Sequence, residues 1–365
     1  MKLTIDKNIE EIPYYPKAAM YGVGDGWVRL ASNENPFPPS PFVLTDIIDA
    51  LPNITRYPGG ENELKEAIAK KYHATPNQIV LGNGSDELIE MALKAAKTSD
   101  RRTVIISQPS FAFYAISSKV YGYNLCKVPL GKQMEVDLKA ILDAIDDQTR
   151  LIFLNNPLNP TGTIFQERDF ITFLKEIPDE ILIVVDEAYA EFVENKTFPN
   201  SCKYINEFPV LTLRTFSKAY ALAGLRLGYG ICETSLASYL ERTRQPFSAN
   251  TIALIAAKSA LNDEEHLKRV LENNKKGKTY LYNAFSDLSI AYVPTEANYI
   301  LFQAGRDAEG ITRDLFEEKV LTRWMGAYDL PEYIRVSIGR MEENERFIEA
   351  LKNIMQRRRA HTFTR

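Results

Sequence analysis

Cysteine and histidine are scarce in this sequence of 365 residues, and their scarcity argues against several kinds of site. The three cysteines, Cys126, Cys202 and Cys232, lie far apart and form no CxxC pair. This pattern favours reduced, mainly buried thiols in a cytoplasmic protein over a disulfide framework. The three histidines are equally scattered. We therefore expect no metal centre and no Ser/His/Asp triad.

Long apolar runs and a strong excess of one charge are also missing. No run is apolar and long enough to cross a bilayer, and residues 1–6 turn polar at once, unlike a signal peptide. The formal net charge of -4 provides no general attraction to nucleic acid or to an anionic membrane. We expect neither as a partner, so any phosphate group must be bound by a local site.

The central part of the chain alternates short, wholly apolar segments with helical patterns. Apolar runs separated by helices are what a mostly parallel sheet covered on both faces requires. Residues 46–250 are therefore expected to form a large α/β domain, with early helices at 63–72 and 86–97. The strand candidates are 79–81, 104–106, 151–154, 181–185 and 210–213.

The two ends of the chain differ from this central part. Residues 1–45 are interrupted by proline and glycine, which predicts an arm that also contributes to a smaller domain. Residues 251–365 contain charged helical patterns around 264–285 and 343–356, typical of a smaller α+β domain. The basic run at 357–359 is interpreted as a solvated helix end, with a polyanion site as the alternative. The strand candidates between the two helices are 299–302 and 334–337.

A glycine-rich turn follows the first predicted strand. The segment GNGSDE at 82–87 opens directly into a helix, whose free N–H groups and positive dipole end suit a phosphate. Ser85 adds a hydroxyl donor. Helix capping by Ser85 or Asp86 explains the same residues equally well.

Polar or aromatic residues also follow the next strands, at the sheet edge where α/β folds bind ligands. Phe111 either stacks on a planar ring or packs in the core. Asn159 lies in a turn made rigid by two Asn-Pro pairs and is placed to donate to a ring hydroxyl. Asp186 ends an apolar strand, where a carboxylate needs a partner such as a protonated pyridine nitrogen. A metal is the alternative, although no further ligand cluster accompanies it.

The fifth strand leads to Lys218, which is surrounded by small residues and not by a charge run. A lysine desolvated against a cationic cofactor loses its proton more easily and can form an imine. Thr215 and Ser217 supply hydroxyl groups, and Arg226 supplies a fixed positive fork for a phosphate. An exposed surface lysine is the competing interpretation.

Together these segments resemble a known enzyme family. TFSKAYALAG at 215–224 is similar to the lysine-attachment pattern of class II pyridoxal-phosphate aminotransferases, and NPTG at 159–162, Asp186 with Tyr189, and Arg226 follow in the family's order. Over nearly the whole chain the resemblance is to the histidinol-phosphate aminotransferases. Its segments are ASNENP at 31–36, RYP at 56–58, GNGSDE at 82–87, RQPFSAN at 244–250, ANYILF at 297–302 and IRVSIG at 334–339.

Three departures accompany the resemblance. RYP continues as Gly59-Gly60-Glu61 where the family often has an acidic residue and proline. Phe111 stands where many members have tyrosine, so that stacking is retained and a hydroxyl is lost. Trp324 and Met325 replace a more polar stretch, which bears on substrate specificity.

The resemblance implies a fold of type I among pyridoxal-phosphate enzymes and a role for each matching residue. Lys218 would hold the cofactor as a Schiff base and transfer the proton, and Asp186 would keep the ring nitrogen protonated. Asn159 and Tyr189 would contact the ring oxygen, and Phe111 would stack on the ring. The phosphate group would be held by Ser85, Asp86, Thr215, Ser217, Arg226 and, from the other subunit of a homodimer, Tyr57.

The resemblance also implies the substrates, an amino donor and a 2-oxo acid. Arg335 would bind the carboxylate of glutamate, Arg323 the phosphate of histidinol phosphate, and Asn35 is a further substrate-binding candidate. The expected reaction is the transamination between L-histidinol phosphate and 2-oxoglutarate in histidine biosynthesis. The alternatives are an aromatic amino acid aminotransferase, a decarboxylase of phosphorylated amino acids on the same fold, and a non-catalytic cofactor-binding protein.

Overall fold

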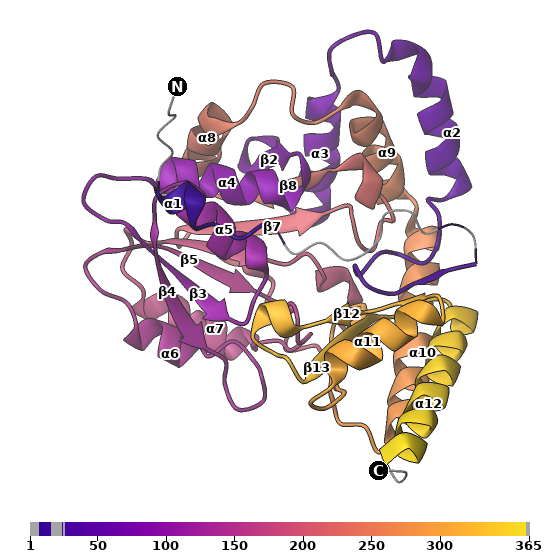
Figure 1. Cartoon of the computed structure of the whole chain (residues 1–365). Helices are drawn as coiled ribbons and strands as arrows, with labels where there is room; N and C mark the ends of the chain where they lie inside the picture. Colours follow the sequence, from indigo (N-terminus) through magenta and orange to yellow (C-terminus); the bar gives the residue numbers. More distant parts are fainter. Residues whose placement is uncertain (1–6, 16–23, 25, 363–365) are drawn as a thin grey trace, which may run out of the picture.

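The computed structural model describes residues 7–15, 24 and 26–362 of the chain (Figure 1). Residues 1–6 and much of the expected amino-terminal arm lie outside these ranges. Within them, no helix is both long and apolar enough to cross a membrane. The described cysteines are all free, and Cys232 is buried.

The larger part of the molecule is built on a sheet of seven strands in the order β2-β8-β7-β6-β5-β3-β4. Strand β8 runs antiparallel to both of its neighbours, and the other pairs are parallel. This confirms the expectation of a mostly parallel sheet. The strands are β2 (Ile79–Gly82), β3 (Thr103–Gln108), β4 (Asn124–Pro129), β5 (Thr149–Asn155), β6 (Leu182–Asp186), β7 (Val210–Thr215) and β8 (Gly228–Ile231).

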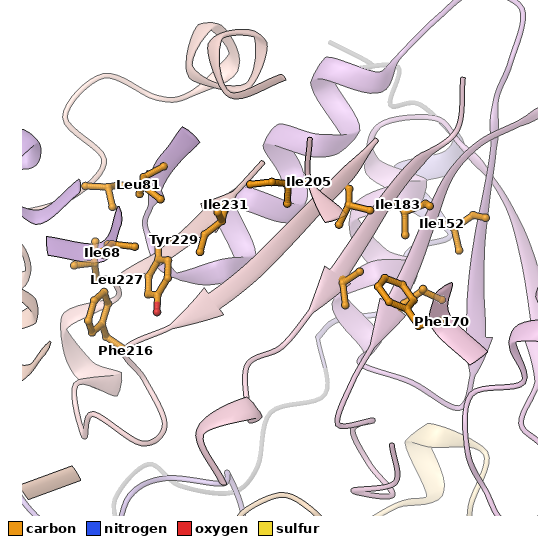
Figure 2. Close-up of a cluster of buried hydrophobic side chains, with 14 of the residues drawn as sticks. Ile68, Leu81, Ile152, Phe170, Ile183, Ile205, Phe216, Leu227, Tyr229 and Ile231 are labelled. Atoms are coloured by element: carbon orange, nitrogen blue, oxygen red, sulfur yellow. The ribbon is translucent and has the colours of Figure 1, made fainter. Parts of the chain in front are cut away.

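Helices cover both faces of this sheet because successive strand residues point to opposite sides. Along β5, for example, Leu151 and Phe153 join one hydrophobic core, whereas Ile152 and Leu154 join the other. The first core is closed by α4 (Gly84–Ala96), α5 (Ala112–Val120) and α8 (Thr234–Thr243). The second core is closed by α3 (Glu61–Tyr72), α6 (Leu138–Asp143), α7 (Glu167–Glu176) and α9 (Thr251–Asn262), and Figure 2 shows part of it.

A second, smaller core lies beside the sheet and carries the carboxyl-terminal part of the chain, orange to yellow in Figure 1. Its antiparallel sheet has the order β12-β13-β10-β9, and a short parallel pair joins β1 to β11. The strands are β1 (Val28–Arg29), β9 (Tyr292–Val293), β10 (Tyr299–Gln303), β11 (Val320–Leu321), β12 (Arg323–Trp324) and β13 (Tyr333–Ser337). The helices are α10 (Glu264–Asp287), α11 (Ala308–Glu317) and α12 (Met341–Thr362).

The packing bears on the division of the chain at residue 250, which stays a prediction. Helix α9 contributes Ala253, Leu254 and Ala257 to the core of the large sheet, where α2 (Pro41–Ala50) also packs. Val28 and Leu30, by contrast, belong to the smaller core. These contacts favour a boundary after α9, with the segment around β1 in the smaller unit.

The basic carboxyl-terminal run is engaged in ion pairs within the smaller unit. Arg358 pairs with Asp307 and Asp314, and Arg357 pairs with Glu318. The side chain of Arg359 lies outside the described residues. These pairs support a helix end on the protein's own surface over a polyanion site.

Candidate active site

Lys218 lies three residues beyond the end of β7, in a loop held by the segment that follows β1. The amide group of Asn35 donates hydrogen bonds of 3.1 Å to the carbonyl oxygens of both Lys218 and Ala219. Nζ of Lys218 donates to the carbonyl oxygen of Ser32 at 3.2 Å. Burial, and next the charge of Arg335, lower the pKa of Lys218 to about 8. A lysine with this pKa supplies a useful fraction of neutral amine close to neutral pH.

Asp186 is the last residue of β6 and is only 3% exposed. Its Oδ1 accepts a hydrogen bond from the backbone N–H of Ala188 at 3.1 Å, and its Oδ2 accepts one from the hydroxyl of Tyr114 at 2.5 Å. Burial raises the pKa of Asp186 to about 6, although both hydrogen bonds act in the opposite direction. The carboxylate is thus buried at a strand end and hydrogen-bonded by the protein, in agreement with the expectation that a carboxylate at this position needs a partner.

The loop that follows β5 meets the middle of β13 through Asn159 and Arg335. Nη1 of Arg335 donates to Oδ1 of Asn159 at 2.5 Å, and Nη2 donates to the carbonyl oxygen of Ala31 at 3.1 Å. Arg335 is 6% exposed, and its Nε has no hydrogen-bond partner. A buried guanidinium with an unused donor is suited to binding an anion.

Arg335 also has a second arginine beside it. Arg323 on β12 is its direct cross-strand partner. Like charges opposite each other on one sheet face are destabilising, so this pairing favours a bound anion between or above them. Tyr15, from the amino-terminal segment, lies near both arginines. Burial raises the pKa of Tyr15, and the charges of Arg323 and Arg335 act against this larger effect.

The start of α4 and the loop after Lys218 form the predicted phosphate subsite. Arg226 donates from Nη1 to the hydroxyl of Ser217 at 3.4 Å and from Nη2 to Oδ2 of Asp86 at 3.1 Å. Gly84 has a φ of +75°, and a Cβ atom there would lie 2.5 Å from Nη2 of Arg226. Glycine is therefore required for the guanidinium to lie against the first turn of the helix. Ser85 stands in that first turn, where N–H groups have no partner within the helix.

Several predicted residues have protein partners that define what they contribute. The hydroxyl of Thr215 accepts from the N–H of Ser217 at 3.1 Å, and so shapes the lysine loop. The hydroxyl of Tyr189 accepts from the amide group of Asn33 at 2.9 Å. Phe111 precedes α5 and meets the ring of Tyr114 edge to face at 5.4 Å.

Tyr57 lies apart from this group on the molecular surface. It is 80% exposed and stacks on Phe247 with ring centroids 4.5 Å apart. In the described part of a single chain it makes no hydrogen bond or ring contact with Lys218 or Arg226. Its predicted role would therefore require a second subunit.

Comparison with known proteins identifies the family. The family model for aminotransferases of class I and II matches residues 25–351. The chain is 40% identical to histidinol-phosphate aminotransferase 1 of Nitrosococcus oceani over 338 residues, covering 92% of this chain and 90% of the relative. It is also 40% identical to histidinol-phosphate aminotransferase of Moorella thermoacetica, covering 90% and 85%.

The chain belongs to the class I and II aminotransferases. Among solved structures, histidinol-phosphate aminotransferase of Sinorhizobium meliloti in complex with pyridoxal-5'-phosphate superposes with a TM-score of 0.86 at 26% identity, covering 96% of this chain and 98% of that one. An aspartate aminotransferase of Thermus thermophilus with maleate has a TM-score of 0.83 at 20% identity, covering 97% and 100%, and so shares the fold.

Aminotransferases of this family depend on pyridoxal phosphate, and the residues of the present chain fit that cofactor. The turn at Gly84 brings Arg226 against free helix N–H groups, which suits a phosphate group. Lys218, with its lowered pKa, suits covalent attachment. Asp186 suits a protonated ring nitrogen, because a buried carboxylate favours a cationic partner.

Sequence reasoning missed two residues that contact members of this candidate site. Tyr114 contacts Asp186, and the only signal was an aromatic residue three positions after Phe111 at the start of a helix. Asn33 contacts Tyr189 and adopts a left-handed conformation with φ 55°. It stands inside the matched segment ASNENP, but neither its position nor its type indicated that partner.

Proposed function

We propose that this protein is a pyridoxal-phosphate-dependent aminotransferase that exchanges an amino group between L-histidinol phosphate and 2-oxoglutarate in histidine biosynthesis. The observation that carries the proposal is the arginine pair Arg323 and Arg335 on one sheet face, with the charge of Arg335 acting on the amine of Lys218. A phosphate ester and a dicarboxylate are both anions, so one cationic pocket serves both substrates in turn. The 40% identity to histidinol-phosphate aminotransferases supports the same choice.

Pyridoxal phosphate, when bound, supplies a carbonyl group that exchanges for the amino group and a ring that accepts the electron pair left at the substrate carbon. We assign Lys218 the covalent attachment and the proton transfer at that carbon through its Nζ. Burial favours the neutral amine that both tasks require. Asp186 holds a proton on the ring nitrogen, and this charge-assisted pairing is stronger in a buried site.

The remaining residues bind and orient. Arg226, Ser217 and the first turn of α4 with Ser85 hold the phosphate group, and Asp86 fixes the guanidinium of Arg226. Asp86 contributes through this ion pair and its N–H, because its carboxylate would repel a phosphate. Thr215 and Asn35 act indirectly, because their hydrogen bonds to the backbone fix the loop that contains Lys218.

The side chains around the ring complete the assignment. Phe111 covers one face of the ring, and Asn159 and Tyr189 donate toward its oxygen. Because Asn33 donates to the hydroxyl oxygen of Tyr189, the hydrogen of that hydroxyl is free to point elsewhere. Because Oδ1 of Asn159 accepts from Arg335, the amide N–H groups of Asn159 are the ones that would donate to the cofactor.

We also propose a homodimer whose active sites lie at the subunit interface. Phe42, Ile48, Ile54 and Tyr57 are between 61% and 80% exposed, and Phe247 is 57% exposed. Apolar side chains gathered in this way along α2 and the segment after it mark an interaction surface. A second subunit covering this surface would bury Tyr57 and allow it to reach the partner's phosphate group. The three free cysteines support a reducing, cytoplasmic location.

A half-reaction tests the function directly. Protein loaded with pyridoxal phosphate is titrated with L-histidinol phosphate while the absorbance of the cofactor is followed. We expect conversion to pyridoxamine phosphate, which 2-oxoglutarate then reverses. A cofactor that ignores histidinol phosphate and responds to phenylalanine would instead identify an aromatic aminotransferase, and release of carbon dioxide would identify a decarboxylase. Absence of any bound cofactor would overturn the assignment of Lys218.

A further inference from the structure

Both carboxylate oxygens of Asp186 have partners within the protein, and the two partners differ in kind. Oδ1 accepts from the backbone N–H of Ala188, two residues along the same chain segment. Oδ2 accepts from the hydroxyl of Tyr114 at 2.5 Å, across 72 positions of sequence. A hydroxyl-to-carboxylate bond of this length belongs to the strong, charge-assisted class.

The ring of Tyr114 is fixed by its surroundings. It is 1% exposed and stacks on Phe153 of the neighbouring strand β5, with ring centroids 4.7 Å apart and planes 8° from parallel. Phe111 makes a second ring contact with it at 5.4 Å, edge to face. Because two rings pack against it, the ring is fixed in place and its hydroxyl is held within hydrogen-bond distance of Asp186.

We propose that Tyr114 is a positioning residue of the transamination site, which orients Asp186 through its hydrogen bond to Oδ2 and keeps the carboxylate ionised for pairing with the cofactor ring nitrogen. The inference rests on the proposed function, because the ring nitrogen enters with pyridoxal phosphate. Tyr114 touches Asp186 and acts through it.

The charges around Asp186 show why it needs such support. Burial first, and then the anions Asp86 on α4 and Glu187 just after β6, raise its pKa to about 6. The phenols of Tyr189 and Tyr299 also face it, and burial keeps both of them neutral by raising their pKa values. The Tyr114 hydroxyl is the first among the groups that lower the pKa of Asp186. Without it, we expect the pKa of Asp186 to rise by about one unit.

The test compares Tyr114→Phe with the wild-type protein across pH. Phenylalanine retains the ring and its stack on Phe153, so the variant is expected to fold. The dissociation constant of pyridoxal phosphate is measured for both proteins by equilibrium dialysis. If the pKa of Asp186 moves from about 6 to about 7, the variant binds about fivefold more weakly near pH 6 and almost equally near pH 8. Lys218 is present in both proteins, so its own titration cancels in the ratio.

Tyr123→Phe provides a matched control. Tyr123 is also buried and donates its hydroxyl to the carbonyl oxygen of Leu93 at 2.8 Å, with no contact to Asp186. We expect its affinity for the cofactor to match wild type at every pH. A merely structural role of Tyr114 would give a loss of affinity that is the same at all pH values, and this result would overturn the proposal.

Two further measurements keep the outcomes distinct. Should Tyr114→Phe fail to fold, 3-fluorotyrosine at position 114 retains the hydroxyl and makes it a stronger donor. The predicted pH effect then has the opposite sign, with tighter binding near pH 6, and unchanged or weaker binding there contradicts the inference. A wild-type protein that binds no pyridoxal phosphate would instead refute the proposed function.

Discussion

Replacing Arg214 by methionine tests how β6, which ends at Asp186, is held to β7, which leads to Lys218. Arg214 on β7 is 8% exposed. Its Nη1 donates to Glu187 at 2.7 Å, and its Nη2 donates to Glu191 at 2.8 Å. Both carboxylates follow β6 closely, so one guanidinium joins the ends of two neighbouring strands.

The expected loss of stability follows from the two anions that remain. Methionine retains most of the volume but no charge, and breaking a buried ion pair by removing one partner costs about 3–5 kcal/mol. Ser201 donates to Glu187 at 2.5 Å, and we expect this bond to remain in the variant. We therefore expect the free energy of unfolding to fall by about 3 kcal/mol near pH 7, toward the lower end of that range.

The loss should depend on pH in a defined direction. Burial raises the pKa of Glu187 above its ordinary value even with Arg214 present, and the variant raises it further. An acid whose pKa is higher in the folded state destabilises that state at pH values above its unfolded pKa, and the penalty disappears below it. The difference between wild type and variant is therefore widest near neutral pH and narrows as the pH falls toward about 4.

Urea denaturation at several pH values measures the effect. Lys139→Met is the control, because Lys139 and Asp143 form an exposed pair whose loss should cost less than about 0.5 kcal/mol. A loss below about 1 kcal/mol for Arg214→Met near pH 7 would refute the reasoning, since it would mean that the two carboxylates need no partner. A loss of unfolding free energy that grows as the pH falls would contradict the predicted direction of the pH dependence.

Three further predictions concern the site itself. Lys218→Ala should abolish turnover in a folded protein that still binds pyridoxal phosphate noncovalently, and near-normal transamination would remove the assignment. Arg323→Met should lower kcat/KM for histidinol phosphate by about 10- to 100-fold and for phenylalanine much less, because it removes a charge-assisted contact to the phosphate group; equal losses would argue against that contact. The rate at which apoprotein attaches the cofactor covalently should rise as the pH rises through about 8, where Lys218 loses its proton, and a rise centred near the ordinary lysine value would contradict the lowered pKa.

Much of the fold and of the candidate site follows from the ends of apolar strands. Such strands are easily recognised, and in a parallel sheet their carboxyl ends meet along one edge. Asp186 ends β6 and the loop of Lys218 follows β7, and these strands are hydrogen-bonded neighbours. The sequence predicted that both residues lie at this edge of the sheet, and the structure adds that their strands are neighbours. Strand β8 escaped prediction because GYGI contains two glycines in four residues, which weakens any strand signal.

The partners of the site residues were not predictable in the same way. The bond between Tyr114 and Asp186 depends on the position of a helix above the sheet, and no periodic pattern encodes that distance. The partners of Arg214 were not predictable for the same reason. A charged residue within an apolar strand shows that some partner must exist, but not which one. Periodicity predicts which face of an element is buried, whereas tertiary packing decides which polar groups meet there.

The segment after β1 shows how tertiary contacts complete the site. Asn33 receives a hydrogen bond on its carbonyl oxygen from Asn298 and donates its N–H to Ser337, both in the smaller unit, while its amide group reaches Tyr189 beside the large sheet. Two residues later, Asn35 holds the backbone of Lys218. One short stretch of chain therefore contacts both units, and within the candidate site it contacts both Tyr189 and Lys218. Leaving buried polar groups without partners is costly. A relative movement of the two units must therefore either break these hydrogen bonds or move Asn33 together with its partners. The orientation of Tyr189 is thereby coupled to the position of β13.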